Sequence, residues 1–209
     1  MLSTFIFLRH GHSAANAAGL LTGQLLGVGL SPQGKRDAQG LVERIGKFKI
    51  DYLHVSPIER CQLTIDPWLN SKYSRSLTSM QINDGISEID FGKWSGRKLS
   101  SLRRDPLWKS VQETPSKVTF PDGESFRKVQ RRAVAAVEEF RSIRGSKTHL
   151  IVSHSDTIKL ITAHYLGIKL DEFQKLIINP ASLTIFRESP KELSLITINN
   201  SGSLREILS

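Results

Sequence analysis

Short apolar runs alternate with stretches of helical periodicity along the chain. Residues 4–8 (TFIFL) form a continuous apolar run, which is typical of a strand covered on both faces. Residues 51–56, 79–84 and 148–153 are predicted as further strands, the second of these being weak. Strands that alternate with helices favour a layered α/β fold, so we expect a three-layer α/β/α sandwich around a largely parallel sheet.

Helices are predicted between these strands. In the segment 31–48, Ser31 suits the N-cap, proline follows at the first helical position, and the apolar residues form one stripe. Residues 124–145 contain the clearest amphipathic helix of the chain, with Gly145 as its expected terminator. A further helix is predicted over 156–166.

Two segments depart from this alternation. Residues 84–123 mix turn residues, aromatics and charges, and we expect an insertion that lies over the sheet like a lid. The apolar runs at 181–189 and 193–200, on either side of Pro190, predict an antiparallel hairpin at the edge of the sheet. No repeat, low-complexity tract or linker interrupts the chain, so one domain is expected over 1–209.

Composition narrows the classes of protein and of partner. The 209 residues carry a formal net charge of +9, which favours anionic partners such as nucleic acid, an anionic membrane surface or phosphorylated small molecules. The basic residues are spread along the chain without a basic tail. Cys61 is the one cysteine, the apolar runs are too short to cross a bilayer, and the first residues lack a basic start. We therefore expect a cytoplasmic protein without a membrane partner.

Basic side chains gather in the sequence just beyond three of the predicted strands. Arg9 and His10 follow the first strand, His154 follows 148–153, and Arg60 comes shortly after the second strand. Ligands of open α/β sheets bind beyond the carboxyl ends of the strands, so these side chains converge if the three strands are neighbours. Such groups repel one another unless an anion binds between them, and guanidinium groups match the geometry of phosphate. This constellation predicts a phosphate pocket.

Five segments carry a resemblance to a known family. FLRHGHSAAN (7–16) resembles the arginine–histidine–glycine signature of the histidine phosphatase superfamily, also called the phosphoglycerate mutase-like family. In the same order, SPIERCQLT resembles its second-arginine motif, ISEIDFGKWSG its acid-bearing motif, FPDGESF its substrate loop and IVSHSDTIKLI its second-histidine motif. The resemblance covers residue 5 to about residue 165 and implies a phosphoglycerate mutase-like fold.

The resemblance also implies a role for each reacting side chain. His10 would be the nucleophile that forms a phosphohistidine, and Glu88 would donate a proton to the leaving oxygen. The contacts implied for the phosphoryl group and the substrate are Arg9, Asn16, Gly23, Arg60, His154 and Ser155. Since arginine and histidine supply the positive charge, neither a metal nor another cofactor is expected.

A few positions depart from the family pattern or leave an assignment open. His12 stands where a carboxylate or amide is usual, and we expect a solvent-facing loop histidine there. Glu59 and Asp90 are alternatives to Glu88, which we favour because SEIDFGKWSG places it as the family motif does. Residues 93–109 hold six basic residues against one acidic residue, and they form either a solvated face or a rim that attracts phosphorylated substrate.

The leading hypothesis is a metal-independent phosphomonoester hydrolase that acts through phosphohistidine on small phosphorylated metabolites. The stretch after Glu88 and the length of 209 residues resemble the hydrolase branch, and a cofactor-dependent phosphoglycerate mutase is the alternative enzyme. A non-catalytic anion- or nucleic-acid-binding regulator on the same fold is the alternative from another class. Nucleic acid is the less favoured partner because zinc-ligand and RNA-stacking motifs are lacking. The C-terminal hairpin offers an edge for a homodimer.

Overall fold

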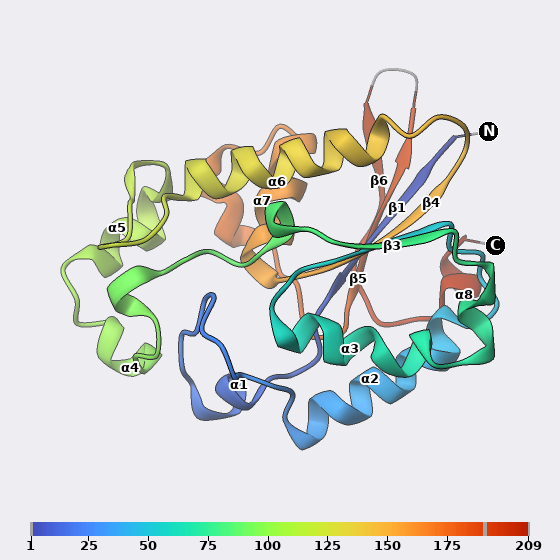
Figure 1. Ribbon diagram of the computed structural model, residues 1–209. Helices are drawn as coiled ribbons and strands as arrows, with labels where there is room; N and C mark the ends of the chain where they lie inside the picture. The colour runs from blue at the N-terminus through green and yellow to red at the C-terminus, as the bar shows by residue number, and fades with distance from the viewer. Residues whose placement is uncertain (1, 190–191, 209) are drawn as a thin grey trace.

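A six-stranded sheet forms the centre of the computed structural model, which describes residues 2–189 and 192–208 (Figure 1). Its spatial order is β3-β2-β4-β1-β5-β6. The strands are β1 (Thr4–Arg9), β2 (Tyr52–Val55), β3 (Ser79–Ile82), β4 (Thr148–Ser153), β5 (Leu183–Glu188) and β6 (Leu193–Asn200). Strands β1 to β4 are parallel, and β5 and β6 run antiparallel to their neighbours. The largely parallel sheet and the C-terminal hairpin are as predicted, while Pro190 lies outside the described residues.

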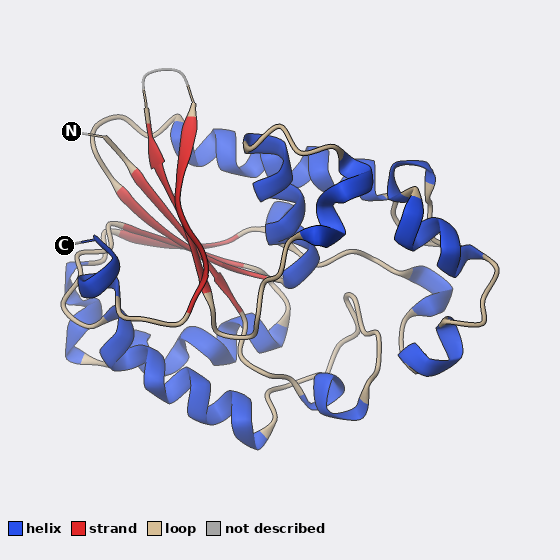
Figure 2. Ribbon diagram, turned by 180° about the vertical axis from the view of Figure 1, so that it is seen from behind, coloured by secondary structure: helices blue, strands red, loops and turns tan. Residues whose placement is uncertain are grey.

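Helices cover both faces of this sheet, which confirms the three-layer arrangement (Figure 2). The longer ones are α2 (Pro32–Ile45), α3 (Glu59–Leu69), α6 (Phe126–Arg141) and α7 (Ser155–Tyr165). The shorter ones are α1 (Ala14–Ala18), η1 (Lys72–Ser76), η2 (Asp84–Ile86), η3 (Gly92–Trp94), α4 (Leu99–Leu102), α5 (Leu107–Glu113), η4 (Pro115–Lys117), η5 (Leu170–Lys175) and α8 (Leu204–Leu208). Within the described ranges, no helix combines the length and the apolar character that crossing a bilayer requires.

The alternation of side chains along β1 explains the two layers of helices. Ile6 and Leu8 pack into a core that includes residues of α2 and α3. Phe5 and Phe7 point to the other face and pack into a core with residues of α6 and α7. Every one of these four side chains is fully buried, as expected for a strand at the centre of a sheet covered on both faces.

Helices α2 and α6 begin where the sequence predicts. The Ser31 side chain accepts a hydrogen bond from the Gly34 backbone N–H, with proline at the first helical position. The apolar face predicted for α6 is buried, but the helix ends at Arg141 and not at Gly145. The Ser142 hydroxyl donates to the Glu139 carbonyl and so satisfies one of the carbonyls left open at the end of the helix.

The segment 84–123 consists of short helices joined by turns, at the left of Figure 1. Phe91, Trp94 and Phe120 form an apolar cluster that continues into α6 and α7. Phe120 packs edge-on against Phe126 at the start of α6, with 5.3 Å between ring centroids. This packing places the segment beside the carboxyl ends of the parallel strands.

Candidate active site

The carboxyl ends of three strands meet because β4 lies between β1 and β2. Arg9 lies opposite Ser153 in the register of β1 and β4, and the His10 N–H continues the ladder by donating to the Ser153 carbonyl at 3.0 Å. Ser56, at the end of β2, donates its N–H to the Val152 carbonyl at 3.0 Å. Residues that are distant in sequence therefore come together beyond the carboxyl ends of these strands.

Arg60 forms hydrogen bonds with both histidines at the carboxyl ends of these strands. Its Nε donates to Nε2 of His10 at 3.1 Å, and its Nη2 donates to Nδ1 of His154 at 3.1 Å. The two imidazole rings lie edge to face, with 5.2 Å between their centroids. The structure thus brings together the second arginine and both histidines of the predicted pocket, and all three are buried.

The hydrogen bonds determine which nitrogen of each histidine carries the proton. Nδ1 of His10 lies 2.7 Å from the Gly11 carbonyl oxygen, which can only accept, so Nδ1 is protonated and Nε2 keeps its lone pair. In His154 the lone pair is on Nδ1, because that nitrogen accepts from Arg60. Nε2 of His154 then donates to the Ser56 hydroxyl at 2.8 Å. His10 therefore presents an unprotonated nitrogen next to a guanidinium group.

Burial and nearby positive charge keep both imidazoles neutral. Burial first, and then the charge of Arg60, hold the pKa of His10 and that of His154 well below 6.5. Burial also lowers the pKa of Arg9 and of Arg60, although a guanidinium group remains charged in proteins. The site beyond the carboxyl ends of the strands therefore combines two fixed positive charges, those of Arg9 and Arg60, with two neutral imidazoles.

Two buried N–H groups of these arginines lack a partner among the described residues. Arg9 donates through Nη1 to the Ile178 carbonyl at 2.5 Å, but its Nε is unpartnered. Nη1 of Arg60 is also buried and unpartnered, while its Nη2 reaches the Gly23 carbonyl at 2.8 Å. Buried polar groups of native proteins are nearly always paired, so these donors are suited to an anion at the site.

Glu88 is the buried carboxyl group of the site. Its Oε1 accepts from the Ile89 N–H at 3.0 Å and from the Thr157 hydroxyl at 3.3 Å. Burial, followed by the nearby charge of Asp156, raises the pKa of Glu88, while Arg60 acts in the opposite direction. A carboxyl group whose pKa is raised in this way keeps its proton to higher pH than usual and can give it to a departing oxygen.

The two alternatives to Glu88 lie in different surroundings. Glu59 is exposed in the first turn of α3. Asp90 uses its Oδ1 to accept from the Gly92 N–H at 2.9 Å and so stabilises a turn. Of the three carboxyl groups, Glu88 alone is buried.

Thr64 and Ser56 support the site, although the sequence analysis assigned neither of them a role. The Thr64 hydroxyl accepts from the Gly11 N–H at 2.9 Å and donates to the Arg60 carbonyl at 2.6 Å. It therefore fixes the loop that follows His10 against the turn of α3 that carries Arg60. Thr64 comes four residues after Arg60, so the helical period of SPIERCQLT places both on one face and is a signal that could have found it.

Asn16 and Ser155 make no hydrogen bond to the two histidine rings in the described part of the chain. Asn16 is exposed, and its Oδ1 accepts from both the backbone N–H and the hydroxyl of Ser13, each at 3.0 Å. The bond from the Ser13 N–H makes a capping box at the start of α1, together with the Asn16 N–H, which donates to the Ser13 hydroxyl at 3.1 Å. Ser155 is half-buried as the first residue of α7, directly after His154.

Gly23 contributes backbone to the site, and His12 lies nearer the protein interior than predicted. Gly23 has a φ of +52°, and a Cβ there would lie 2.6 Å from the Ile89 carbonyl oxygen, so a residue with a side chain is disfavoured. His12 is half-buried, with Nδ1 at 2.9 Å from the Ser31 hydroxyl, whereas the sequence predicted a solvent-facing side chain. The reason is that Ser31, at the start of α2, packs against this loop.

Comparisons with known proteins agree with this geometry. The sequence profile of the histidine phosphatase superfamily (branch 1) matches residues 5–201. Phosphoserine phosphatase 1 of Hydrogenobacter thermophilus is 29% identical, with 96% of this chain and 94% of that protein covered. A 2,3-bisphosphoglycerate-dependent phosphoglycerate mutase of Thermoplasma acidophilum is 26% identical, with 97% and 96% covered. The crystal structure of an alpha-ribazole phosphatase from Shigella flexneri has the same fold, with a TM-score of 0.82, 22% identity and 96% and 98% of the two chains covered.

Proposed function

The chain belongs to the histidine phosphatase superfamily, and from this premise we propose that it is a phosphomonoester hydrolase that works through a phosphohistidine at His10. One observation carries the proposal. The unprotonated Nε2 of His10, which accepts from Nε of Arg60, lies in a buried site with the unpartnered N–H groups of Arg9 and Arg60. The phosphorus of a phosphoryl group is an electrophile that the His10 nitrogen can attack, and its anionic oxygens can accept from the arginine N–H groups.

The first half of the reaction transfers the phosphoryl group to the enzyme. The Nε2 lone pair of His10 attacks phosphorus in line with the leaving oxygen, so a P–N bond forms as the P–O bond breaks. Glu88 gives its proton to the leaving oxygen, which departs as an alcohol. The bond from Nδ1 of His10 to the Gly11 carbonyl keeps the ring oriented throughout.

The second half returns the enzyme to its starting state. A water molecule attacks phosphorus and gives a proton to the Glu88 carboxylate, and the P–N bond breaks with its electron pair returning to Nε2 of His10. Inorganic phosphate leaves, and Glu88 is again protonated. The N–H donors of Arg9 and Arg60 stabilise the charge on the phosphoryl oxygens in both halves.

Stabilisation of that charge by Arg9 and Arg60 also supports a reaction that needs no metal ion. Across residues 2–189 and 192–208, no three His, Cys, Asp or Glu side chains are grouped so as to hold a metal. We expect turnover to survive prolonged dialysis against a chelator; loss of turnover that a divalent cation restores would contradict this part of the proposal.

Small phosphorylated metabolites are the proposed substrates, and the cytoplasm is the proposed location. A panel of phosphoserine, alpha-ribazole phosphate, 3-phosphoglycerate and p-nitrophenyl phosphate tests both the activity and its range. The mutase is the alternative, because several relatives carry that activity in their names. Incubation with 3-phosphoglycerate and 2,3-bisphosphoglycerate separates the two: phosphate release faster than isomerisation supports the hydrolase, and the reverse order supports the mutase. Salt-sensitive retention on DNA without phosphate release would support a binding protein instead.

A further inference from the structure

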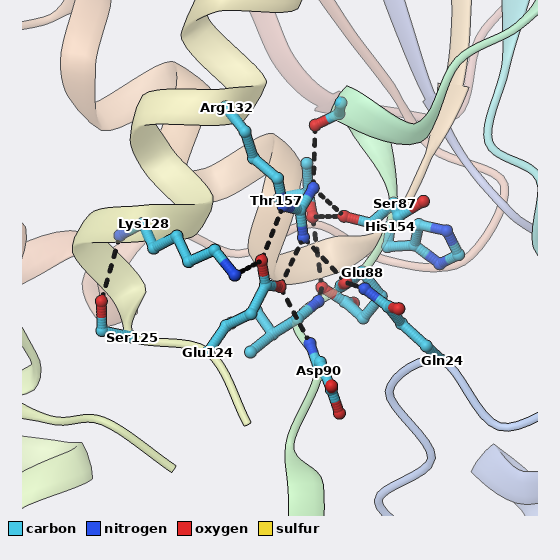
Figure 3. Close-up of polar contacts among 12 residues, drawn as sticks. Gln24, Ser87, Glu88, Asp90, Glu124, Ser125, Lys128, Arg132, His154 and Thr157 are labelled. Atoms are coloured by element: carbon cyan, nitrogen blue, oxygen red, sulfur yellow. Dashed lines mark hydrogen bonds and ion pairs between the residues drawn. The ribbon is translucent and has the colours of Figure 1, made fainter. Parts of the chain in front are cut away.

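One arginine holds the backbone of the segment that carries the acid. Arg132 of α6 reaches three carbonyl oxygens of residues 85–88 (Figure 3). Its Nη1 donates to the carbonyls of Gly85 and Ser87, both at 2.8 Å, and its Nη2 donates to that of Glu88 at 2.9 Å. These bonds link a segment with little regular structure to a long helix.

Glu124 holds the other edge of the same guanidinium group. Nε of Arg132 donates to Oε1 of Glu124 at 3.1 Å, and Nη2 donates to Oε2 at 2.9 Å, which is a two-pronged ion pair. Glu124 also accepts from the Asp90 N–H at 3.1 Å and donates its own N–H to the Asp90 carbonyl at 2.8 Å. Arg132 and Glu124 therefore hold the segment 85–90 on both sides of Glu88.

We propose that Arg132 is a positioning residue for the proton transfer, and that together with Glu124 it fixes the backbone of Glu88 so that the carboxyl group faces the leaving oxygen. This inference rests on the proposed function, because it assumes that Glu88 is the acid. Arg132 grips the acid's own carbonyl and those one and three residues before it. A shift of about 1 Å in the position of a reacting group can cost roughly 100-fold in rate.

Two neighbouring contacts show why a shift of this backbone reaches the carboxyl group. The Thr157 hydroxyl lies 2.8 Å from the Ser87 carbonyl and 3.3 Å from Oε1 of Glu88, so α7 contacts backbone and carboxyl together. Gln24, next to Gly23, donates to the Glu88 carbonyl at 2.8 Å and is the second donor on that oxygen. A displaced carbonyl would change both contacts. Among the residues that the structure describes, Arg132 donates only to Glu124 and to backbone carbonyls, so its loss should lower kcat on phosphoserine and leave KM nearly unchanged.

The test compares substrates whose leaving groups differ in their need for a proton. In Arg132→Lys, which cannot form the two-pronged pair, we expect kcat/KM on phosphoserine, which reports the first half-reaction alone, to fall roughly 10- to 100-fold. On p-nitrophenyl phosphate, whose leaving group hardly needs a proton, we expect a fall of less than about threefold. Glu124→Gln keeps the bonds from Arg132 to the carbonyls but loses the ion pair. Its kcat/KM on phosphoserine should lie between that of Arg132→Lys and that of the wild type.

Arg131 offers a matched control on the same helix. It is exposed and makes no hydrogen bond or ion pair within the described ranges, so Arg131→Lys should match the wild type on both substrates. Combining Arg132→Lys with Glu88→Gln should cost no more on phosphoserine than Glu88→Gln alone, because the arginine acts through the acid. Thermal unfolding of each variant checks that it is folded.

The outcomes separate this inference from the function on which it rests. Equal losses on both substrates, or losses that multiply in the double variant, overturn the positioning role even when Glu88→Gln discriminates between the substrates as expected. If the Arg132→Lys variant does not fold, the same comparison of the two substrates in the Glu124→Gln variant tests the positioning role. If the wild-type protein releases no phosphate from any substrate, the proposed function itself fails and this inference fails with it.

Discussion

Nε of Arg60 donates its hydrogen bond to the same nitrogen of His10 that carries the free lone pair, at 3.1 Å. The arginine therefore aims the nucleophile before any substrate is bound, and its positive charge helps to keep the imidazole neutral. An arriving phosphoryl group offers Arg60 better acceptors than the ring nitrogen, because its oxygens are charged. The same exchange releases the lone pair for attack, so binding of the anion and exposure of the nucleophile are one event.

Replacing the nucleophile should remove both turnover and the covalent intermediate. We expect His10→Ala to release no phosphate and to retain no acid-labile phosphoryl label after rapid quenching. Because Nδ1 of His10 is protonated and bonded to Gly11, the wild-type label should be on Nε2, which phosphorus NMR of the denatured adduct can determine. His164→Ala changes an exposed residue at the end of α7 and should label normally. A label retained by His10→Ala would place the nucleophile elsewhere.

Replacing the acid should affect substrates according to their leaving groups. Glu88→Gln keeps the shape of the side chain and removes the proton that can be transferred. We expect kcat/KM, which reports transfer of the phosphoryl group to His10 and not its later hydrolysis, to fall roughly 10²- to 10⁴-fold on phosphoserine and only slightly on p-nitrophenyl phosphate. Glu59→Gln, at an exposed position of α3, is the matched control and should leave both rates unchanged. A uniform loss on the two substrates would argue that Glu88 is not the acid.

The pH profile should report the same carboxyl group. The raised pKa of Glu88 keeps the carboxyl protonated to higher pH than usual, and activity is lost as pH rises through that value. On the acid side, the lowered pKa of His10 keeps the nucleophile neutral well below pH 6.5. In kcat/KM for phosphoserine, which reports the first half-reaction alone, Glu88→Gln should therefore lose the alkaline limb, while ionisation of the substrate affects both enzymes alike. An alkaline limb that persists in the variant would have to come from another group.

Much of the fold follows from local patterns in the chain. The apolar run of β1, the apolar stripe of α6 and the N-cap at Ser31 depend on residues that are close in sequence, so the amino-acid sequence predicts them. The gathering of Arg9, His10 and His154 follows from strand ends alone, once β1 and β4 are neighbours. The motif around Arg60 adds the second arginine, because helix α3 begins directly beyond β2.

The remaining features depend on contacts between segments that no local pattern connects. Arg132 lies 44 residues from Glu88 in sequence, and its bonds go to backbone carbonyls, which every residue possesses. The short helices of 84–123 take their places by packing Phe91 and Trp94 against a shared cluster, so they show no period of their own. His54 meets its partner His149 only because β2 and β4 pair with one particular register.

That pair of histidines should make stability depend on pH. His54 Nε2 lies 3.1 Å from His149 Nδ1, both rings are buried, and the other nitrogen of each lacks a partner in the described structure. Burial, and then the charge of His149, lowers the pKa of His54 to about 3; burial lowers that of His149 to about 4. Protons therefore bind the unfolded chain more tightly. The stabilisation is complete above pH 6.5 and is lost as pH falls towards these values.

Urea unfolding at a series of pH values measures this effect. Between pH 6.5 and 5, each histidine should cost about 2 kcal/mol of the free energy of unfolding. His149→Phe keeps a ring against Phe5 and removes one titrating group, so the loss over this range should be smaller in that variant. His164→Gln alters an exposed histidine and should show the wild-type slope. Equal slopes in all three proteins would mean that the buried pair does not titrate as described.

A contact between two glycines sets the distance from helix α2 to the catalytic loop. A Cβ on Gly34 would overlap the carbonyl oxygen of His12, and one on Gly11 would lie 2.9 Å from the Gly34 carbonyl oxygen. Gly11 also supplies the carbonyl that orients His10. In Gly34→Ala, either the helix or the loop must move, so we expect a loss of about 1–3 kcal/mol in the free energy of unfolding together with a lower kcat.

Gly40, in the same helix, has open space at its Cβ position. Gly40→Ala should therefore stabilise the protein by up to about 1 kcal/mol and leave kcat unchanged, since alanine has the higher helix propensity. Denaturant unfolding and kcat on p-nitrophenyl phosphate, measured for both variants, separate close packing from helix propensity. If Gly34→Ala behaves like Gly40→Ala, the loop holds His10 without the support of α2, and the bond between Gly11 and Thr64 is then sufficient to position it.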